Sequence, residues 1–402
     1  MKRLERNNYL EKLIAFRDKH IIKIITGIRR CGKSTLMEIY QDALRSRGVV
    51  EEQIVAVNFE DFDFRALRQP EQLHAYIKER ITPGKTTYVF LDEIQHVENW
   101  PEVIDSLFLR KELDLYLTGS NAYLLSSEIA TMISGRYVEL KMLPLSFGEY
   151  VSAMDDSQPL SQLYRSYIET TSFPYGLELQ GQPKELRDYL EGIYNTVVVK
   201  DLVSRKKIPD VMMLESVARF LFDAIGSPLS TKKIADTMTS SGRKIDVKTV
   251  EKYVDALMES FIVYQAKRYN IKGKQHLKTL EKYYVVDMGL RFMLLGSRST
   301  DVGHMLENVI YLELLRRGYE VYVGKVDNLE VDFVAMDGKE TRYYQVAATV
   351  RDQQTLQREL ASLQKINDHY PKRILTLDED PEADYDGIRR INALEWLVGR
   401  TE

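Results

Sequence analysis

One stretch near the N-terminus decides the fold: Gly27-Ile28-Arg29-Arg30-Cys31-Gly32-Lys33-Ser34. It matches the pattern G-x-x-x-x-G-K-[ST], follows the apolar run Ile21 to Thr26 and precedes a helical stretch that begins at Thr35. In that setting the two glycines let backbone N–H groups close around phosphate oxygens at a helix N-terminus. We therefore expect a nucleotide-binding loop for ATP, made of Gly27, Ile28, Arg29, Arg30, Cys31, Gly32, Lys33, Ser34 and Thr35.

The last residues of the loop predict how a triphosphate would be held. Lys33 is expected to reach the β- and γ-phosphate oxygens, and Ser34 to offer its hydroxyl to Mg²⁺. Arg29 and Arg30 occupy positions that the pattern leaves free, so both could simply face solvent. Cys31 also lies at a position that the pattern leaves free. The default interpretation is that the loop tolerates a cysteine there and that the thiol has no chemical role.

A second apolar run, Tyr88 to Leu91, ends in the acids Asp92 and Glu93, 59 positions after Lys33. Asp92 is predicted to hold Mg²⁺ through water, and Glu93 to accept the proton of the attacking water. The alternative is a strand that ends in exposed acids. That alternative fits the residues but leaves Lys33 and Ser34 without a metal partner.

A third apolar run, Leu115 to Thr118, is followed by Gly119, Ser120 and Asn121. A polar side chain at the tip of a strand beside the acidic strand could sense the γ-phosphate, so Ser120 or Asn121 is the predicted sensor. The alternative is a turn that caps the next helix, a position where Ser and Asn are common.

Arg136, in Ser134-Gly135-Arg136, precedes the last strand of this region. Its guanidinium could reach a phosphate of a neighbouring subunit as an arginine finger, which would require a homo-oligomer. A surface or ion-paired arginine is the alternative.

The order of apolar and amphipathic stretches predicts the domain organisation. Short apolar runs alternate with helix-like segments through residues 1–150, which is typical of a parallel α/β sheet. The expected strands are 20–26, 54–59, 87–91, 114–118 and 137–140. After this P-loop ATPase domain we predict a helical lid or linker at 151–210, a winged helix-turn-helix at 211–295 and an α/β domain at 296–402.

Composition excludes several protein classes. The chain has 402 residues, 44% of them hydrophobic and 29% charged, with a formal net charge of −4, as in globular proteins. Its single cysteine rules out an internal disulfide and a cysteine-based zinc site. The N-terminus is charged, and the apolar runs have the length of strands, so we expect a cytoplasmic protein without a signal peptide or membrane span.

Basic residues concentrate in the predicted winged helix. Residues 232–274 contain ten Lys or Arg and five Asp or Glu, a local balance of +5. In the expected recognition helix the apolar positions Val250, Val254, Leu257 and Phe261 would point inward, and Lys248, Thr249 and Lys252 outward. Lys267, Arg268, Lys272 and Lys274 would lie on the wing and contact DNA phosphates. Winged helices also bind proteins, so a protein partner is the alternative.

These motifs resemble those of the AAA-type ATPases of bacteria and archaea that carry a C-terminal domain of unknown function, a group close to the STAND NTPases. The resemblance spans nearly the whole chain. It rests on 27–34, Asn58-Phe59-Glu60-Asp61, Leu91-Asp92-Glu93-Ile94-Gln95, Thr118-Gly119-Ser120-Asn121, Ser134-Gly135-Arg136 and Leu143-Pro144-Leu145-Ser146-Phe147. It implies a nucleotide-dependent switch or remodeller with a winged helix in the middle and a restriction-endonuclease-like fold at the end.

The last hundred residues resemble the PD-(D/E)xK nuclease layout. Glu307 lies in a predicted helix, Asp332 in a predicted strand, and residues 343–347 form the next strand. The chemistry needs a second acid and a lysine, but Gln345 and Ala347 occupy those positions. We therefore expect the fold without DNA cleavage, with Glu307 and Asp332 as relics of the nuclease site or as structural hydrogen-bonding residues.

Three functions remain in competition. The leading hypothesis is an ATPase that couples its nucleotide state to engagement of DNA or a protein. The second is a DNA-binding regulator in which ATP is a structural or slow-switch ligand. The third is a working, metal-dependent nuclease, against which Gln345 and Ala347 argue.

Overall fold

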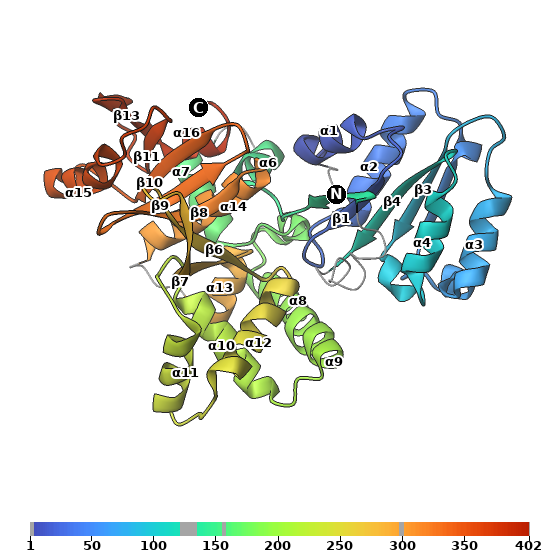
Figure 1. The fold of residues 1–402 in the computed structure, drawn as a ribbon, viewed down its shortest axis with the longest axis horizontal. Helices are drawn as coiled ribbons and strands as arrows, with labels where there is room; N and C mark the ends of the chain where they lie inside the picture. Colours follow the sequence, from blue (N-terminus) through green and yellow to red (C-terminus); the bar gives the residue numbers. More distant parts are fainter. Residues whose placement is uncertain (1–3, 121–134, 155–157, 297–300, 402) are drawn as a thin grey trace. The chain divides into compact units, whose positions relative to one another are not determined.

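The computed structural model describes residues 4–120, 135–154, 158–296 and 301–401. The chain divides into two compact units, Met1–Met142 and Leu143–Glu402 (Figure 1). We expected the first domain to extend to residue 150. Its last strand ends at Lys141, and the Leu145 N–H then donates to the Ser172 carbonyl at 2.8 Å within the second unit.

The first unit contains a five-stranded sheet in the order β2-β3-β4-β1-β5. Every neighbouring pair is parallel, as the sequence predicted. The strands are β1 (Ile22–Thr26), β2 (Ile54–Asn58), β3 (Thr87–Asp92), β4 (Leu113–Gly119) and β5 (Tyr137–Lys141). The helices and 3₁₀ turns are α1 (Asn7–Ala15), α2 (Lys33–Arg45), α3 (Pro70–Glu79), α4 (Trp100–Phe108), η1 (Glu51–Gln53), η2 (Phe62–Arg68) and η3 (Ile94–His96).

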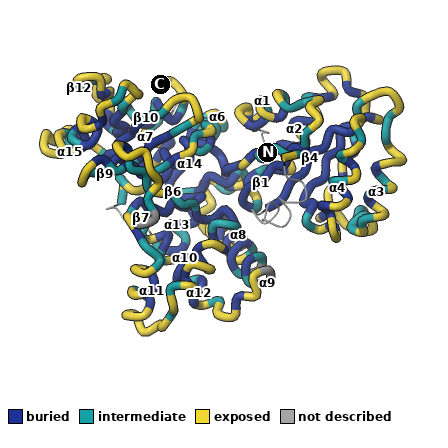
Figure 2. The backbone as a smooth tube through the Cα atoms, viewed as in Figure 1, coloured by how far each residue is buried: buried dark blue, intermediate teal, exposed yellow. Residues whose placement is uncertain are grey.

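Helices cover both faces of this sheet (Figure 1). Alternate strand residues such as Val89 and Leu117 pack in one core with Ile77 of α3 and Ile104 of α4. The opposite face meets α2, where the hydroxyl groups of Tyr40 and Tyr116 lie 2.9 Å apart. Because both faces are covered, the central strands β3 and β4 are buried along their whole length, as Figure 2 shows.

The second unit begins with helices and ends with an eight-stranded sheet. Its helical elements are α6 (Phe147–Ala153), α7 (Leu160–Glu169), η5 (Pro174–Leu179), α8 (Pro183–Tyr194), the π-helical η6 (Asn195–Leu202), α9 (Val203–Lys206), α10 (Val211–Asp223), α11 (Thr231–Ser240), α12 (Val247–Glu259), α13 (Met288–Leu295), α14 (Val302–Arg316), α15 (Gln353–Gln364) and α16 (Ala393–Leu397). Its strands are β6 (Val263–Asn270), β7 (Gln275–Val285), β8 (Glu320–Val326), β9 (Leu329–Met336), β10 (Thr341–Ala347), β11 (Lys372–Thr376), β12 (Ala383–Tyr385) and β13 (Ile388–Asn392).

The helices at 211–259 follow the expected order, and α12 turns the expected side chains inward. Val250, Val254 and Leu257 of α12 are buried, and Phe261 after its end is buried as well. The α12 helix begins at a cap, because the Asp246 carboxylate accepts a hydrogen bond from the Thr249 N–H at 3.0 Å. The apolar stripe of this helix could therefore be read directly from its 3.6-residue period.

The hairpin β6–β7, which we predicted as a wing, is joined to the C-terminal sheet. It is antiparallel, but β6 also pairs in parallel with β8 at Arg268–Asn270. The sheet therefore runs β12-β13-β11-β10-β9-β8-β6-β7 across the predicted boundary at residue 295. An unpaired β6 edge would leave backbone N–H and C=O groups without partners, and β8 satisfies them.

The C-terminal sheet packs against α15. Ala347 of β10 and Ile374 of β11 belong to the same apolar cluster as Leu360 and Leu363 of α15. Throughout the described ranges, no helix is both long and apolar enough to cross a membrane.

Candidate functional site

The loop between β1 and α2 has the backbone conformation that its glycines predict. Gly27 and Gly32 have φ angles of 151° and 102°, where side chains are strained. A Cβ at position 27 would overlap the Met142 carbonyl oxygen. Gly27 is therefore required by a close backbone approach within the first unit.

Lys33 lies buried inside this loop. Its ammonium donates hydrogen bonds to the carbonyl oxygens of Gly27 at 3.1 Å and Ile28 at 3.3 Å, and to the Ser120 hydroxyl at 3.0 Å. It also lies 3.7 Å from a Glu93 carboxylate oxygen. The predicted lysine and the second predicted acid are thus brought together.

Asp92 lies at the end of β3 between two hydroxyl groups. The Thr118 hydroxyl donates a hydrogen bond to its carboxylate. Burial raises the pKa of Asp92, and the hydrogen bonds from Ser34 and Thr118 only partly oppose that rise. A buried carboxylate whose charge is incompletely compensated is suited to a cation, and the adjacent Ser34 hydroxyl supplies a second hard oxygen ligand.

Glu93 follows directly and is held by side chains from two segments. Its carboxylate accepts hydrogen bonds from the Ser120 hydroxyl and the Gln95 amide, and its backbone has a φ of 56°. Burial by itself would raise the pKa of Glu93, but attraction to Lys33 and the bonds from Ser120 and Gln95 outweigh it and lower the pKa. Glu93 is therefore held as a charged carboxylate beside the lysine.

The strand order explains why these groups meet. β4 lies between β1, which leads into the loop, and β3, which ends in the acids. Thr118 and Ser120 at the carboxyl end of β4 therefore lie between Lys33 and the acidic pair. The expectation that this strand lies beside the acidic strand is confirmed by the pairing of β3 with β4. Asn121, the other predicted sensor, lies outside the described residues.

The remaining predicted loop residues lie at different depths. Ile28 and Cys31 are buried, and burial raises the pKa of the Cys31 thiol. Arg30 and Thr35 are exposed. Arg29 is half-buried and forms an ion pair with Glu60. The side chains at these positions therefore differ in environment, and only their backbone groups have a shared role in the predicted loop.

Arg136 is engaged within its own unit. Its guanidinium forms an ion pair with Asp105 of α4 and lies 5.7 Å from the centroid of the Phe108 ring. The ion-paired arginine that we considered as the alternative is what the structure contains. A finger role would require Arg136 to leave Asp105.

Several residues that contact the predicted site residues were not predicted, among them Thr118, Gln95 and Arg6. Thr118 and Gln95 bond to the acids, and Arg6 donates to the Cys31 carbonyl at 3.1 Å. Thr118 and Gln95 stand in the motif segments and could have been considered there. Nothing in the local sequence marks Arg6, because its contact depends on the packing of the N-terminal segment.

The two acids of the predicted nuclease-like layout also lie close together, but around a lysine that we did not predict. Glu307 of α14 and Asp332 of β9 both face the ammonium of Lys282 on β7. Gln345 and Ala347 lie on β10, where Gln345 bonds to Glu359 and Ala347 packs in the apolar cluster. Among the described residues, no three or more His, Cys, Asp or Glu side chains form a group that could hold a metal ion.

The predicted DNA-binding residues do not all reach solvent. Lys248, Lys252 and Lys267 are exposed. The Arg268 side chain is only 14% exposed and lies 3.8 Å from Glu330, so it is not available as a phosphate contact. β6 pairs with β8 at this residue, whereas the adjacent Lys267 stays exposed.

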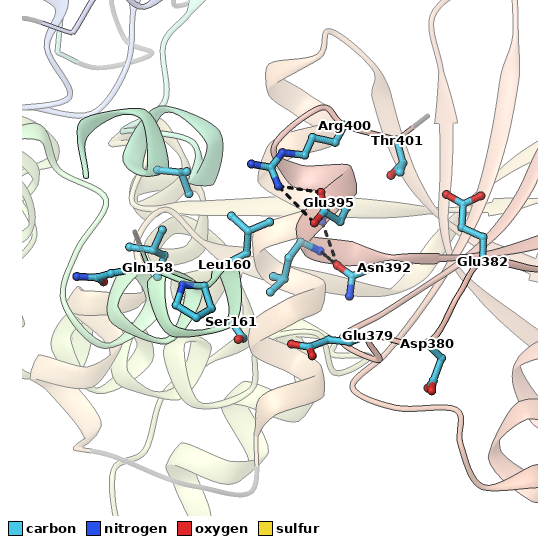
Figure 3. A pocket seen from close by; sticks show the side chains of 14 residues that line it. Gln158, Leu160, Ser161, Glu379, Asp380, Glu382, Asn392, Glu395, Arg400 and Thr401 are labelled. Carbon is cyan, nitrogen blue, oxygen red and sulfur yellow. Dashed lines mark hydrogen bonds and ion pairs between the residues drawn. The ribbon is translucent and has the colours of Figure 1, made fainter. Parts of the chain in front are cut away.

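A pocket of about 590 Å³ lies in the second unit (Figure 3). It is formed by the start of α7 and the segment from Glu379 to the C-terminus, and its rim is acidic. Three of its carboxylates are already paired: Glu395 with Arg400 at 3.3 Å, Glu382 with Arg389 at 2.8 Å and Asp380 with Arg351 at 2.8 Å. None of its lining residues belongs to the predicted motifs.

The chain is 39% identical to an uncharacterized protein of Haemophilus influenzae over 399 residues, which cover 98% of each chain. It belongs to the same protein family. Another uncharacterized protein with similarity to this family comes from Methanocaldococcus jannaschii, at 29% identity over 78% of this chain and 71% of that one.

Two family models match this member of the family. Residues 19–151 match the AAA domain, and residues 161–301 match a domain of unknown function. A Walker-type ATPase of Pyrococcus abyssi has a similar fold, with a TM-score of 0.50 and 16% identity over 72% of this chain and 95% of that chain. The prediction of an AAA-type P-loop ATPase fold for the first unit is confirmed. The winged-helix and nuclease-like assignments stay predictions.

Proposed function

We propose that the first unit binds Mg-ATP at the loop of residues 27–35 and hydrolyses it. One observation carries the proposal: Lys33 and Ser34 at the start of α2 converge with Asp92 and Glu93 at the end of β3, with the Lys33 ammonium 3.7 Å from Glu93 and Ser34 bonded to Asp92. In the alternative interpretation, a strand that ends in exposed acids, Asp92 and Glu93 would face solvent. Both residues are instead buried.

Each group has a role that follows from its chemistry. Lys33 would bind β- and γ-phosphate oxygens in place of the two loop carbonyls that it now contacts. Ser34 and Asp92 would hold Mg²⁺, which when bound neutralises charge on the same phosphates. Glu93 would accept the proton of the attacking water.

The contact between Lys33 and Glu93 implies that nucleotide binding activates the base. In the structure, attraction to Lys33 is the main interaction that lowers the pKa of Glu93. A triphosphate would draw the ammonium toward its own oxygens, and burial would then raise the pKa of Glu93. The carboxylate would become a stronger base only when ATP is present.

Ser120 is the proposed sensor, because its hydroxyl contacts both Lys33 and Glu93. Loss of this hydroxyl should change turnover more than nucleotide affinity. Arg136 as a finger in a homo-oligomer remains a second proposal, and it predicts that Arg136→Ala slows turnover only at protein concentrations where subunits associate.

The ATPase assignment can be tested with two substitutions. Lys33→Ala should remove nucleotide binding measured by isothermal titration calorimetry. Glu93→Gln should keep nucleotide binding but slow phosphate release by about 10²–10⁴-fold, the usual contribution of a general base.

Glu98→Gln is the matched control, since Glu98 is an exposed acid shortly after the same strand. Its turnover should equal that of the parent protein. Unchanged hydrolysis in both Lys33→Ala and Glu93→Gln would show that the site is wrongly assigned.

We also propose that the ATPase engages DNA through α12. The exposed Lys248 and Lys252 on this helix support the proposal, since basic side chains on a helix face provide phosphate contacts. Duplex DNA binding, measured by fluorescence anisotropy, should weaken as the salt concentration rises. At a fixed salt concentration, Lys252→Glu should bind DNA more weakly than the parent protein.

The other partner classes give different results in the same experiments. A protein partner would leave the ATPase rate and the anisotropy insensitive to DNA. DNA binding without any change in turnover would instead favour a regulator that uses ATP as a structural ligand. Lys339→Glu, at an exposed lysine between β9 and β10, controls for the general effect of charge reversal.

A further inference from the structure

A buried lysine lies at the centre of the acids in the C-terminal sheet. The side chain of Lys282, on β7, is 4% exposed. Its ammonium lies 2.9 Å from Glu307, 2.9 Å from Glu330 and 3.5 Å from Asp332. These carboxylates come from α14 and β9, so the lysine joins three elements that are distant in the sequence.

The acids are positioned by further hydrogen bonds that leave their charge directed at the lysine. Tyr284 donates to the Glu307 oxygen that faces Lys282, at 2.6 Å. The Val346 N–H donates to the other oxygen of Asp332 at 2.9 Å. Burial alone would lower the pKa of Lys282, but Glu307, Asp332 and Glu330 outweigh burial and raise it.

The nuclease layout implies a divalent cation held by these acids, and the residues do not fit one. The Gln345 amide oxygen accepts from the Asp332 N–H at 2.7 Å, and its amide nitrogen donates to Glu359 at 2.6 Å. Ala347 lies in the apolar cluster under α15. An acid in place of Gln345 or a lysine in place of Ala347 would fit only if the residues around it repacked.

We propose that the Lys282 ammonium is the resident cation of this cluster and excludes a divalent metal from it. A protonated lysine has three N–H donors, which is one for each of the three converging carboxylates. A divalent ion entering beside it would meet a like charge in a buried site, where repulsion is weakly screened. The cluster is then a metal-independent joint that fixes the hairpin after α12 to α14 and β9. This inference does not depend on the proposed ATP chemistry.

Mn²⁺ binding to the full-length protein tests the proposal. Mn²⁺ is titrated up to about 1 mM, the weak end of protein affinities for divalent cations, and followed by electron paramagnetic resonance. The parent protein and Asp332→Asn should bind Mn²⁺ equally. Lys282→Met, which keeps the length of the side chain without its charge, should gain a site that Lys282→Met/Asp332→Asn lacks. The control Lys339→Ala removes an exposed lysine in the turn between β9 and β10 and should gain nothing.

Two results would overturn the proposal. One is Mn²⁺ binding by the parent protein that Asp332→Asn removes, particularly if metal-dependent DNA cleavage is lost with it. The other is a folded Lys282→Met protein, judged by circular dichroism, that gains no Asp332-dependent site. If Lys282→Met does not fold, the comparison of the parent protein with Asp332→Asn still decides, because equal binding supports the proposal and an Asp332-dependent site refutes it.

Discussion

Gln345→Glu is the most informative substitution in the second unit, since it restores the second acid of the nuclease pattern. In the structure both Gln345 and Glu359 are buried, at 6% exposure each, and the amide of Gln345 donates to the carboxylate of Glu359 at 2.6 Å. A glutamate would keep the acceptor for the Asp332 N–H. It would remove the donor and set two carboxylates against each other.

The expected cost follows from those contacts. A hydrogen bond to a charged group contributes about 1.5–3 kcal/mol, and a buried charge that loses its partner costs about 3–5 kcal/mol. We therefore expect Gln345→Glu to lower the free energy of unfolding of the second unit by about 3–5 kcal/mol. Adding Glu359→Gln exchanges acid and amide and should recover most of that loss. Only the Arg358 ion pair is then missing, and its guanidinium side chain is 75% exposed, so the pair contributes about 0–1 kcal/mol.

Tryptophan fluorescence can follow this unit alone. The chain has two tryptophans, Trp100 in the first unit and Trp396 in the second. In a Trp100→Phe background, urea unfolding monitored at Trp396 reports the free energy of unfolding of the second unit. A stability of Gln345→Glu equal to that of the background, or a double variant no more stable than the single one, would refute the proposed contact.

Two further predictions concern the first unit. Gly27→Ala should abolish nucleotide binding because its Cβ would overlap the Met142 carbonyl, whereas Gly48→Ala, at a φ of 87° with open space around it, should keep full affinity in the same calorimetric titration. Asp114→Asn should destabilise the unit by about 3–5 kcal/mol in urea unfolding, because it leaves the fully buried Lys23 without its ion-pair partner; a loss below about 1 kcal/mol would contradict this account.

Much of the first unit could be predicted from the sequence. The loop, the acidic strand tip and the five strands were each marked by contiguous residues. The burial of Lys23 could not be predicted, since its partner Asp114 lies on a neighbouring strand and a lone lysine in an apolar run gives no sign of that partner. The pairing of the predicted wing with the C-terminal sheet could not be predicted for the same kind of reason, because β6 pairs with β8 more than fifty residues away along the chain.

The sequence by itself determined the loop of residues 27–34 and the acidic pair at 92 and 93, because backbone conformation and strand ends depend on neighbouring residues. Only the tertiary structure decided which side chains contact these residues. The strand order placed Ser120 between Lys33 and Glu93, and the pairing of β6 with β8 allowed Lys282 to face Glu307 and Asp332. Such contacts join residues far apart in the chain, and the burial that makes them necessary exists only after the sheets form.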